Sequence, residues 1–417
     1  MDGVESVLDR VWRDEAAGML GVLGRRLGDL DAAEESLQDA IAEALRRWPD
    51  EGVPANPAGW LVTTAWRKAI DRRRREANGR AKEAVLAADP THGRSSGGAD
   101  PLWPPSGDDR LAVVFACCHP ALPEPSRVAL TLHAVAGLPA ETVAAAFLLP
   151  RATVAQRLVR AKRHLREQGV RVETPEPGER ATRLPSVLRV LYLIYNEGYL
   201  STSRDAVERR ELAREGLDLA RQLAALVPDE PEAAGLAALC ELHESRAAGR
   251  FGADGRLVLL EDQDRSGWDR RLIGSALTRL AGAAALDRPG PYQLEAAIAA
   301  QHALAPSWER TDWVAVRGLY DLLLRLRPTP VVLLGRAVAT GFTAGPARAL
   351  AEVDELGGRL GGYRLWHATR ADLLRRLGRT AEAAEATRRA LALATNPAER
   401  ELLTGRLAAL TARLDGA

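Results

Sequence analysis

The feature that most constrains this sequence is a basic stretch, residues 138–166, with the pattern of two short helices joined by a tight turn. In its second half, apolar residues recur at intervals of four, three and four, which places them on one stripe of a helix. These residues are Val154, Leu158, Ala161 and Leu165. Pro150 ends the first helix, because proline cannot continue the interior hydrogen-bond ladder, and Thr153 can cap the second. The stretch therefore predicts a helix-turn-helix.

The polar side of the second helix is strongly basic. Residues 138–166 contain six Arg or Lys and one acidic residue, a net charge of +5. In the DNA major groove, outward polar groups near the start of such a helix read base edges, and flanking cations contact phosphates. The alternative is an amphipathic surface helix with a solvated basic face.

Seven side chains of this helix are candidate DNA contacts. They are Arg151, Thr153, Gln156, Arg157, Arg160, Lys162 and Arg163. Gln156 and Arg160 point directly away from the apolar stripe and are expected to read bases. Arg157 and Lys162 flank the stripe and are expected to neutralise phosphates.

Length and composition limit the class of protein. At 417 residues the chain exceeds what one compact core usually organises, so two to four domains are expected. Three cysteines are too few for a disulfide framework. Apolar runs are shorter than a membrane span and no basic-then-apolar leader opens the sequence, which predicts a cytoplasmic protein. No catalytic triad or phosphate-binding glycine loop is present, so neither an enzyme nor a cofactor is expected.

Charge is sorted along the chain, although the net charge is only +1. Residues 1–51 carry 13 acidic and 6 basic residues, net −7, whereas residues 52–82 carry 8 basic and 2 acidic residues, net +6. A helix is predicted over 29–48, with Asp31 as its cap and Glu34 completing a capping box. Its expected exposed face consists of Glu34, Glu35, Gln38, Asp39 and Glu43. Such a face is either a solvated surface or the docking site of a partner.

A loop is predicted at residues 48–60, because this segment contains three prolines and two glycines. It opens into a helix in which tryptophans alternate with cations. Single-stranded DNA needs this combination, since cations neutralise phosphates and aromatic rings stack on bases. The alternative is a core helix with buried tryptophans and a solvated arginine run. The residues concerned are Trp60, Trp66, Arg67, Lys68 and Arg72 to Arg75.

Two groups of residues have the donor types of a metal site. The first group is Cys117, Cys118, His119 and His133, and the second is Glu261, Asp262, Asp264 and Asp269. Adjacent cysteines on a helix diverge by 100°, and no paired CxxC spacing supports a zinc site. A cluster of acids more often caps helices and pairs with arginines. We therefore expect no metal at either group.

Three motifs carry a resemblance to a known family. They are DAAEESLQDA at 31–40, NPAGWLVTTAWRKAIDRRRR at 56–75 and TVAQRLVRAKRHL at 153–165. Together they resemble regions 2 and 4 of a bacterial RNA polymerase sigma factor of the extracytoplasmic function (ECF) type, which lacks region 3. Where many members have a basic residue after Thr-Val, this chain has Ala155.

The resemblance implies a role for each segment. The acidic helix would bind the clamp helices of core RNA polymerase through Asp31, Glu34, Glu35, Gln38 and Asp39. The loop at 49–58 would hold a base flipped from the −10 element, and the basic helix would hold the adjoining backbone. The implied −10 contacts are Asn56, Trp60, Trp66, Arg67, Lys68, Arg72 and Arg73. The helix at 153–166 would read the −35 element.

The rest of the chain lies beyond a minimal sigma factor. Helical patterns continue to the end, and residues 363–397 have the small residues with which the two helices of a tetratricopeptide repeat cross closely. These are Ala371, Gly378, Ala383 and Ala390, and less faithful helix pairs are predicted at 206–246 and 330–356. The strings NEGY at 196–199, VLLEDQDRSGWDR at 258–270 and PYQLEAAIAAQHA at 291–303 resemble the sigma subgroup with a tetratricopeptide-like C-terminal extension. In that subgroup the extension is thought to replace a separate anti-sigma regulator.

The combined prediction is an all-α chain. Its expected parts are sigma region 2 at 1–84, a flexible linker at 85–108, sigma region 4 at 109–170, a hinge at 171–183 and a tetratricopeptide-like regulatory extension at 184–417. The expected partners are core RNA polymerase, promoter DNA and a protein or ligand bound by the extension, with no membrane. The alternatives are a helix-turn-helix regulator with a sensor array and a scaffold with incidental basic helices. Neither needs the acidic helix, proline-rich loop and Trp/Arg helix of residues 29–75.

Overall fold

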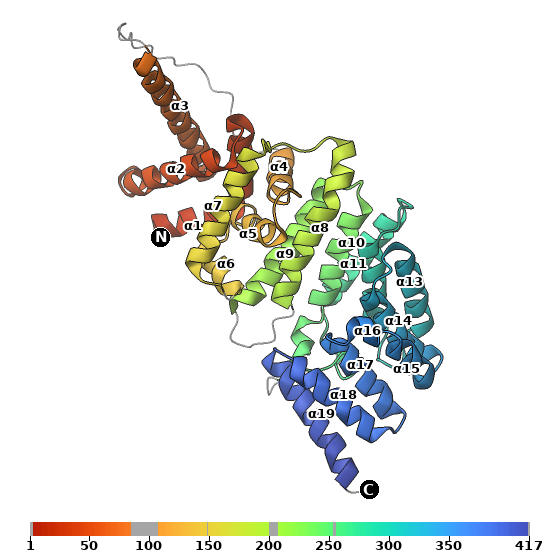
Figure 1. The fold of residues 1–417 in the computed structure, drawn as a ribbon. Coiled ribbons are helices and arrows are strands. Elements are labelled where there is room, and N and C mark those ends of the chain that lie inside the picture. The colour runs from red at the N-terminus through yellow and green to blue at the C-terminus, as the bar shows by residue number, and fades with distance from the viewer. Residues whose placement is uncertain (1–2, 85–106, 148, 200–206, 253–255, 416–417) are drawn as a thin grey trace. The chain divides into compact units, whose positions relative to one another are not determined.

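The computed structural model describes residues 3–84, 107–147, 149–199, 207–252 and 256–415 (Figure 1). The chain forms two compact units, Met1–Ile194 and Tyr195–Ala417. Its described residues are 78% helical and contain no strand, only an isolated bridge between Phe251 and Leu257. The predicted all-α class is therefore confirmed.

The first unit begins with three helices, α1 (Val4–Leu27), α2 (Leu30–Glu51) and α3 (Pro57–Ala84). Each packs against the other two. Their buried side chains include Met19, Leu20, Leu23, Leu37 and Leu61. α1 ends at Gly28, whose φ of 73° is a left-handed conformation that glycine adopts without steric penalty.

The start of α2 differs from the prediction. Asp29, not Asp31, caps the helix, and its carboxylate accepts a hydrogen bond of 2.9 Å from the backbone N–H of Asp31. The helix begins at Leu30, two residues earlier than a cap at Asp31 would allow. Asp31 therefore does not cap the helix, and its carboxylate lies on the helix surface.

The predicted loop at 48–60 is shorter in the structure, because α2 continues through Pro49 to Glu51 and α3 begins at Pro57. Trp48 is buried and packs edge-on against Trp60, with ring centroids 5.3 Å apart. This aromatic contact anchors the last turns of α2 against α3. Pro49 therefore lies inside α2 and, contrary to the prediction from the sequence, does not end the helix.

Four shorter helices follow: α4 (Gly107–Cys117), α5 (Glu124–Ala134), α6 (Ala140–Ala146) and α7 (Arg151–Glu167). α6 and α7 form the predicted helix-turn-helix, and α7 also packs on α5. All four predicted stripe residues of α7 are buried, which confirms the predicted apolar face. Thr153 does not cap α7, since the helix starts earlier, with Pro150 at the N-cap position and no side-chain cap. The linker predicted at 85–108 lies outside the described residues up to residue 106.

α8 (Pro177–Tyr199) occupies much of the hinge predicted at 171–183 and the start of the predicted extension. Ser186 Oγ donates a hydrogen bond of 3.0 Å to the carbonyl of Cys118. Arg183 Nη2 donates one of 3.2 Å to the carbonyl of Phe115. The first part of α8 is therefore fastened to the end of α4, within the first unit.

The second unit is an array of helices that pack on their neighbours in sequence. They are α9 (Val207–Leu226), α10 (Pro231–Glu244), α11 (Arg270–Ala284), α12 (Pro291–Leu304), α13 (Trp313–Leu326), α14 (Pro330–Thr343), α15 (Pro346–Asp354), α16 (Gly357–Leu360), α17 (Arg364–Arg376), α18 (Thr380–Leu393) and α19 (Pro397–Asp415). The 363–397 prediction corresponds to the pair α17 and α18, joined at Gly378 with a φ of 73°. Ala371, Ala383 and Ala390 are buried, as the close crossing of a repeat requires.

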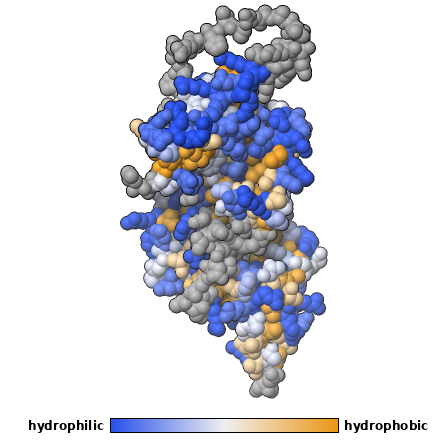
Figure 2. Space-filling model, turned by 90° about the vertical axis from the view of Figure 1, so that its left-hand side faces the viewer, coloured by the Kyte–Doolittle hydropathy of each residue, from blue (hydrophilic) through white to orange (hydrophobic). Residues whose placement is uncertain are grey.

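The surface of the described residues shows no membrane-spanning feature. None of their helices is long and apolar enough to cross a bilayer. On the face drawn in Figure 2, hydrophilic residues cover most of the described surface, and hydrophobic residues form scattered patches.

Candidate nucleic-acid and polymerase interfaces

The outward face of α7 carries most of the predicted DNA contacts. Arg151, Thr153, Gln156, Arg160 and Arg163 are exposed, and Arg157 is half-buried. Sequence reasoning missed Val159, which is 60% exposed on the same helix. An exposed valine among these polar side chains suits contact with a thymine methyl group. Its spacing of three residues from Gln156 and four from Arg163 is the signal that identifies it.

Lys162 differs from the other α7 cations, because its side chain is only 11% exposed. Its Nζ lies 3.0 Å from Asp31 Oδ1 and 3.1 Å from Glu34 Oε2, both on α2. The phosphate contact predicted for Lys162 is therefore blocked in this arrangement. The ammonium group already pairs with two carboxylates.

The loop before α3 places Asn56 at the start of that helix. Asn56 Oδ1 accepts a hydrogen bond of 3.0 Å from the backbone N–H of Gly59, the interaction of a helix cap. Trp60 and Trp66 are each half-buried. The Trp66 ring lies 5.6 Å from the guanidinium carbon of Arg26. Neither tryptophan is a fully buried core residue, so both retain surface for stacking.

Two cations of α3, Lys68 and Arg72, are paired with acidic residues of α2. Lys68 Nζ lies 3.2 Å from Glu43 Oε2, and Arg72 pairs with Glu35 at 2.5 Å and also with Asp39. Arg67 is exposed, and Arg73 Nη2 donates to the carbonyl of Leu27 at 2.6 Å. Lys68 and Arg72 therefore neutralise part of the acidic face of α2, whereas Arg67 remains exposed.

The predicted docking face of α2 is divided in two. Glu35 and Asp39 turn toward α3, and their side chains remain 64% and 45% exposed. Asp31 and Glu34 turn toward α5 and α7, and Gln38 Nε2 donates to Glu34 Oε1 at 3.2 Å. The predicted exposure of Glu34 was wrong, since the residue is 5% exposed. The helix α7, distant in sequence, covers it.

Five residues form a charged cluster between these helices, which we call the α2–α7 cluster. They are Asp31, Glu34, His133, Lys162 and Arg166. His133 Nε2 lies 3.1 Å from Glu34 Oε1, and His133 Nδ1 lies 2.9 Å from the Leu138 carbonyl. Arg166 Nη1 lies 3.3 Å from Asp31 Oδ2. The cluster joins the acidic helix to the helix-turn-helix segment.

The α2–α7 cluster shifts the ionisation of its members. Burial opposes the charge of Glu34, but the hydrogen bond from His133 and the charge of Lys162 lower its pKa to about 2. Burial also opposes the charge of His133, but the Glu34 carboxylate raises the pKa of His133 above its ordinary value. For Lys162, burial opposes the charge, but the Glu34 carboxylate favours it, and the pKa is raised. Each partner therefore favours the charged form of the others.

The two predicted metal-type groups have other roles. Burial raises the pKa of the Cys118 thiol to about 12 and that of Cys117 well above its usual value, so neither forms a thiolate at neutral pH. Asp264 and Asp269 accept backbone N–H groups at the starts of helical turns. The interpretation of these acids as helix caps is therefore confirmed. Among the described residues, no group of three or more His, Cys, Asp or Glu is placed to hold a metal ion.

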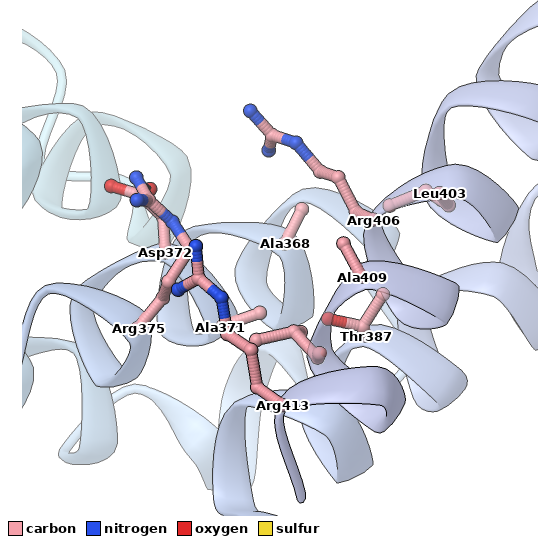
Figure 3. Close-up of a pocket in the computed structure, with 10 residues that line it drawn as sticks. Ala368, Ala371, Asp372, Arg375, Thr387, Leu403, Arg406, Ala409 and Arg413 are labelled. Atoms are coloured by element: carbon pink, nitrogen blue, oxygen red, sulfur yellow. Dashed lines mark hydrogen bonds and ion pairs between the residues drawn. The ribbon is translucent and has the colours of Figure 1, made fainter. Parts of the chain in front are cut away.

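A small pocket lies between α17 and α19 in the second unit (Figure 3). Its volume is about 100 Å³. Its centre is apolar, with Ala368, Ala371, Ala409 and Leu410, and three arginine side chains surround it: Arg375, Arg406 and Arg413. Arg375 pairs with Asp372 at 2.5 Å, and Arg406 lies 3.3 Å from Glu261. The pocket therefore has an apolar floor, and three arginines but only one acidic residue, Asp372, line it.

Three protein families match successive segments of the chain. Residues 12–79 match Sigma-70 region 2, and residues 113–165 match Sigma-70 region 4. Residues 183–284 match a family of unknown function, DUF6596. This third match begins within α8, so it includes the helix that is fastened to α4.

Three relatives illustrate the range of similarity. An uncharacterised protein of Rhizobium meliloti is 44% identical over 381 residues, covering 91% of this chain and 90% of that protein. A probable ECF RNA polymerase sigma factor, SigI, of Mycobacterium tuberculosis is 26% identical over 38% of this chain and 54% of its own length. The ECF sigma factor SigK of Mycobacterium ulcerans is 31% identical over 35% of this chain and 76% of its own length. No solved structure matches the chain.

Proposed function

This chain belongs to the ECF RNA polymerase sigma factors and carries a helical C-terminal extension, and we propose that the extension controls its activity as an initiation factor. The sigma family acts in transcription initiation without enzymatic chemistry. The partners of a sigma factor are core RNA polymerase and promoter DNA. A sigma factor works where these partners are, so we place the protein in the cytoplasm.

We propose that α2, α3 and α7 each bind a different target. The exposed carboxylates of Glu35 and Asp39 support docking of α2 on the polymerase clamp helices. Asn56, at the start of α3, and half-buried Trp60 support capture of the −10 element, because a flipped base needs polar and stacking partners together. The outward polar face of α7, centred on Gln156 and Arg160, supports reading of the −35 element. The observation that carries this proposal is the presence of both sigma regions with exposed polar faces on α2 and α7.

The extension is proposed to bind an acidic partner at the pocket between α17 and α19. The excess of arginine around an apolar floor is complementary to a carboxylate carried next to a short apolar group. A helical-repeat array commonly binds protein segments in the groove formed by its successive helices. A helix-turn-helix regulator that is not a sigma subunit would lack a use for α2 and α3, and that alternative is not favoured.

Run-off transcription with purified core RNA polymerase tests the proposed function. We expect specific product from a cognate promoter, and we expect the double variant Glu35→Arg/Asp39→Arg to bind core polymerase at least tenfold more weakly, because it reverses the charge of the docking face. The matched control is Arg72→Ala, which breaks the same two ion pairs while leaving both carboxylates in place. Equal binding by the double variant and the wild type would contradict docking through this face.

If α7 reads the promoter, two kinds of variant should differ in how they weaken DNA binding. Gln156→Ala and Arg160→Ala should each cost about 1–3 kcal/mol on the cognate −35 element and little on altered elements. Arg157→Ala should weaken all sequences alike and reduce the slope of log affinity against log salt, because a phosphate contact carries no sequence information. Duplex binding by fluorescence anisotropy at several salt concentrations measures both. Equal losses on cognate and altered duplexes for all three variants would refute the division.

A further inference from the structure

Three strings of the sequence meet in one side-chain cluster of the second unit. They begin at residues 196, 258 and 291, and the proposed contacts with polymerase and DNA use none of them. Tyr199, from the first string, ends α8. Arg265 and Trp268 come from the second string and His302 from the third. Two arginines at the short helix η1 (Ala247–Arg250) complete the group. We call it the Arg246 cluster, and its members are Tyr199, Arg246, Arg250, Arg265, Trp268 and His302.

Two of the guanidinium groups lie at the end of α8. The Arg250 guanidinium carbon is 4.0 Å from the centre of the Tyr199 ring, and Arg250 Nη1 donates to the Tyr199 carbonyl. The Arg246 guanidinium carbon is 5.9 Å from the same ring. The ring also stacks on His243, with centroids 5.2 Å apart. These contacts fix the Tyr199 ring beside two positive charges.

The third guanidinium group lies against the other side of η1. Arg265 Nη1 donates to the carbonyls of His302 at 2.7 Å and Ala305 at 2.9 Å. The Arg265 guanidinium carbon is 5.2 Å from the centre of the Trp268 ring. A Cβ added at Gly249, inside η1, would lie 3.5 Å from Trp268 Nε1. The indole N–H therefore lies beside the segment that carries the other two arginines.

Several polar atoms of the Arg246 cluster are buried without a partner. Arg265 Nη2, Trp268 Nε1 and Tyr199 Oη make no hydrogen bond among the described residues. The three residues are only 5%, 3% and 8% exposed. Because a buried donor without an acceptor costs free energy, folded proteins supply a partner to nearly all of them. The donors therefore indicate a missing acceptor.

The Arg246 cluster also has uncompensated positive charge. Within the part of the chain that the structure describes, no carboxylate forms an ion pair with Arg246, Arg250 or Arg265. Burial and the charge of Arg246 lower the pKa of both Arg250 and Arg265, although Glu244 and Glu309 act in the opposite direction. A water molecule satisfies single donors but leaves this charge in place, whereas an anion satisfies the donors and balances the charge.

We propose that the Arg246 cluster binds a phosphate group, either free phosphate or the phosphate of a small metabolite. A phosphate group carries a charge of about −1.5 to −2 at neutral pH, and its oxygens accept from several donors at once. Guanidinium groups match it well, because their planar N–H forks bind two oxygens together. A carboxylate has one charge and two oxygens, fewer than three arginines, an indole N–H and a tyrosine hydroxyl call for. None of these residues lines the pocket between α17 and α19.

Phosphate titration of the full chain tests this site, with chloride at equal ionic strength as the reference. We expect the Tm of the second unit to rise by roughly 5–10 °C when phosphate is in hundredfold excess over its Kd. By calorimetry, Arg246→Gln should bind phosphate at least tenfold more weakly. Its Tm without phosphate should not fall, because the substitution removes an unpaired charge. The matched control is Arg359→Gln, which removes an exposed charge on α16 and should leave phosphate binding unchanged.

A second variant and two further ligands complete the test. Tyr199→Phe keeps the stacked ring, removes the buried hydroxyl and should weaken phosphate binding at least threefold. Acetate should bind at least tenfold more weakly than phosphate. Tighter binding of glycerol phosphate than of inorganic phosphate would identify a phosphorylated metabolite as the ligand, and the reverse order would identify the free ion.

Two results would overturn the phosphate site. One is an equal phosphate affinity of the wild type, Arg246→Gln and Tyr199→Phe. The other is the absence of binding of both inorganic phosphate and glycerol phosphate to the wild-type chain. The measurement involves neither polymerase nor DNA, so its outcome is independent of the proposed function.

Discussion

Replacing Glu241 by alanine should destabilise the second unit by about 3 kcal/mol, because it removes the acceptor that joins three helices. Glu241 lies on α10 and is 0% exposed. Its Oε1 accepts from Arg221 of α9 at 2.8 Å, from Ser275 of α11 at 3.1 Å and from Arg279 of α11 at 3.3 Å. Without it, two arginines that are about a third exposed lose their partner and a cavity forms beneath them.

Thermal unfolding of the full chain measures this effect. For a unit of this size, about 3 kcal/mol corresponds to a fall of roughly 6–12 °C in the Tm of the transition that belongs to the second unit. Glu385→Ala is the matched control, since Glu385 is an exposed carboxylate that pairs with Arg388 and Arg389 on α18, and its loss should leave this Tm nearly unchanged. Equal Tm values for the two variants would contradict the role of Glu241.

The parts of the fold that the sequence could predict are those that depend on the local spacing of residues. The buried stripe of α7 follows from apolar residues at helical spacing, which requires no knowledge of the rest of the chain. The buried alanines of α17 and α18 follow in the same way from a repeat pattern. The caps were less predictable, because Asp29 and Asp31 are both suitable residues and only the backbone conformation distinguishes them.

The charged interface could not be predicted from local pattern. From the sequence, Glu34 is expected on the exposed face of its helix, and His133 is considered only as a possible metal ligand. They meet across 99 residues of sequence, and Glu34 meets Lys162 across 128. Charge sorting along the chain predicted that acidic and basic segments exist. It did not predict that they would bind each other, because an intramolecular partner and an external one have the same charge signature.

The domain boundary also depended on long-range contacts. Prolines and charges at 171–183 predicted a hinge, yet helix α8 begins at Pro177 and its residues Arg183 and Ser186 hydrogen-bond to α4. The sequence has no local sign of this attachment, because the acceptors are backbone carbonyls. A cut placed at the predicted hinge would therefore remove part of the first unit.

Truncation after Tyr199, rather than near Pro177, should separate the role of the extension from the stability of the sigma portion. We expect residues 1–199 to keep the first unit folded. We expect residues 1–176 to be less stable by about 5 kcal/mol, because they lack all of α8, which includes buried Leu184, Val187 and Leu191, and each buried apolar side chain contributes about 1.5–3 kcal/mol. That loss is comparable to the whole stability of many domains. Urea unfolding of the two fragments measures the difference.

Transcription by residues 1–199 then reports on the extension alone. At equal concentration we expect it to give several-fold less run-off product than the full chain, because we expect the control by the extension to be positive. Higher product from residues 1–199 would show net inhibition, and equal product would show that the extension does not control initiation.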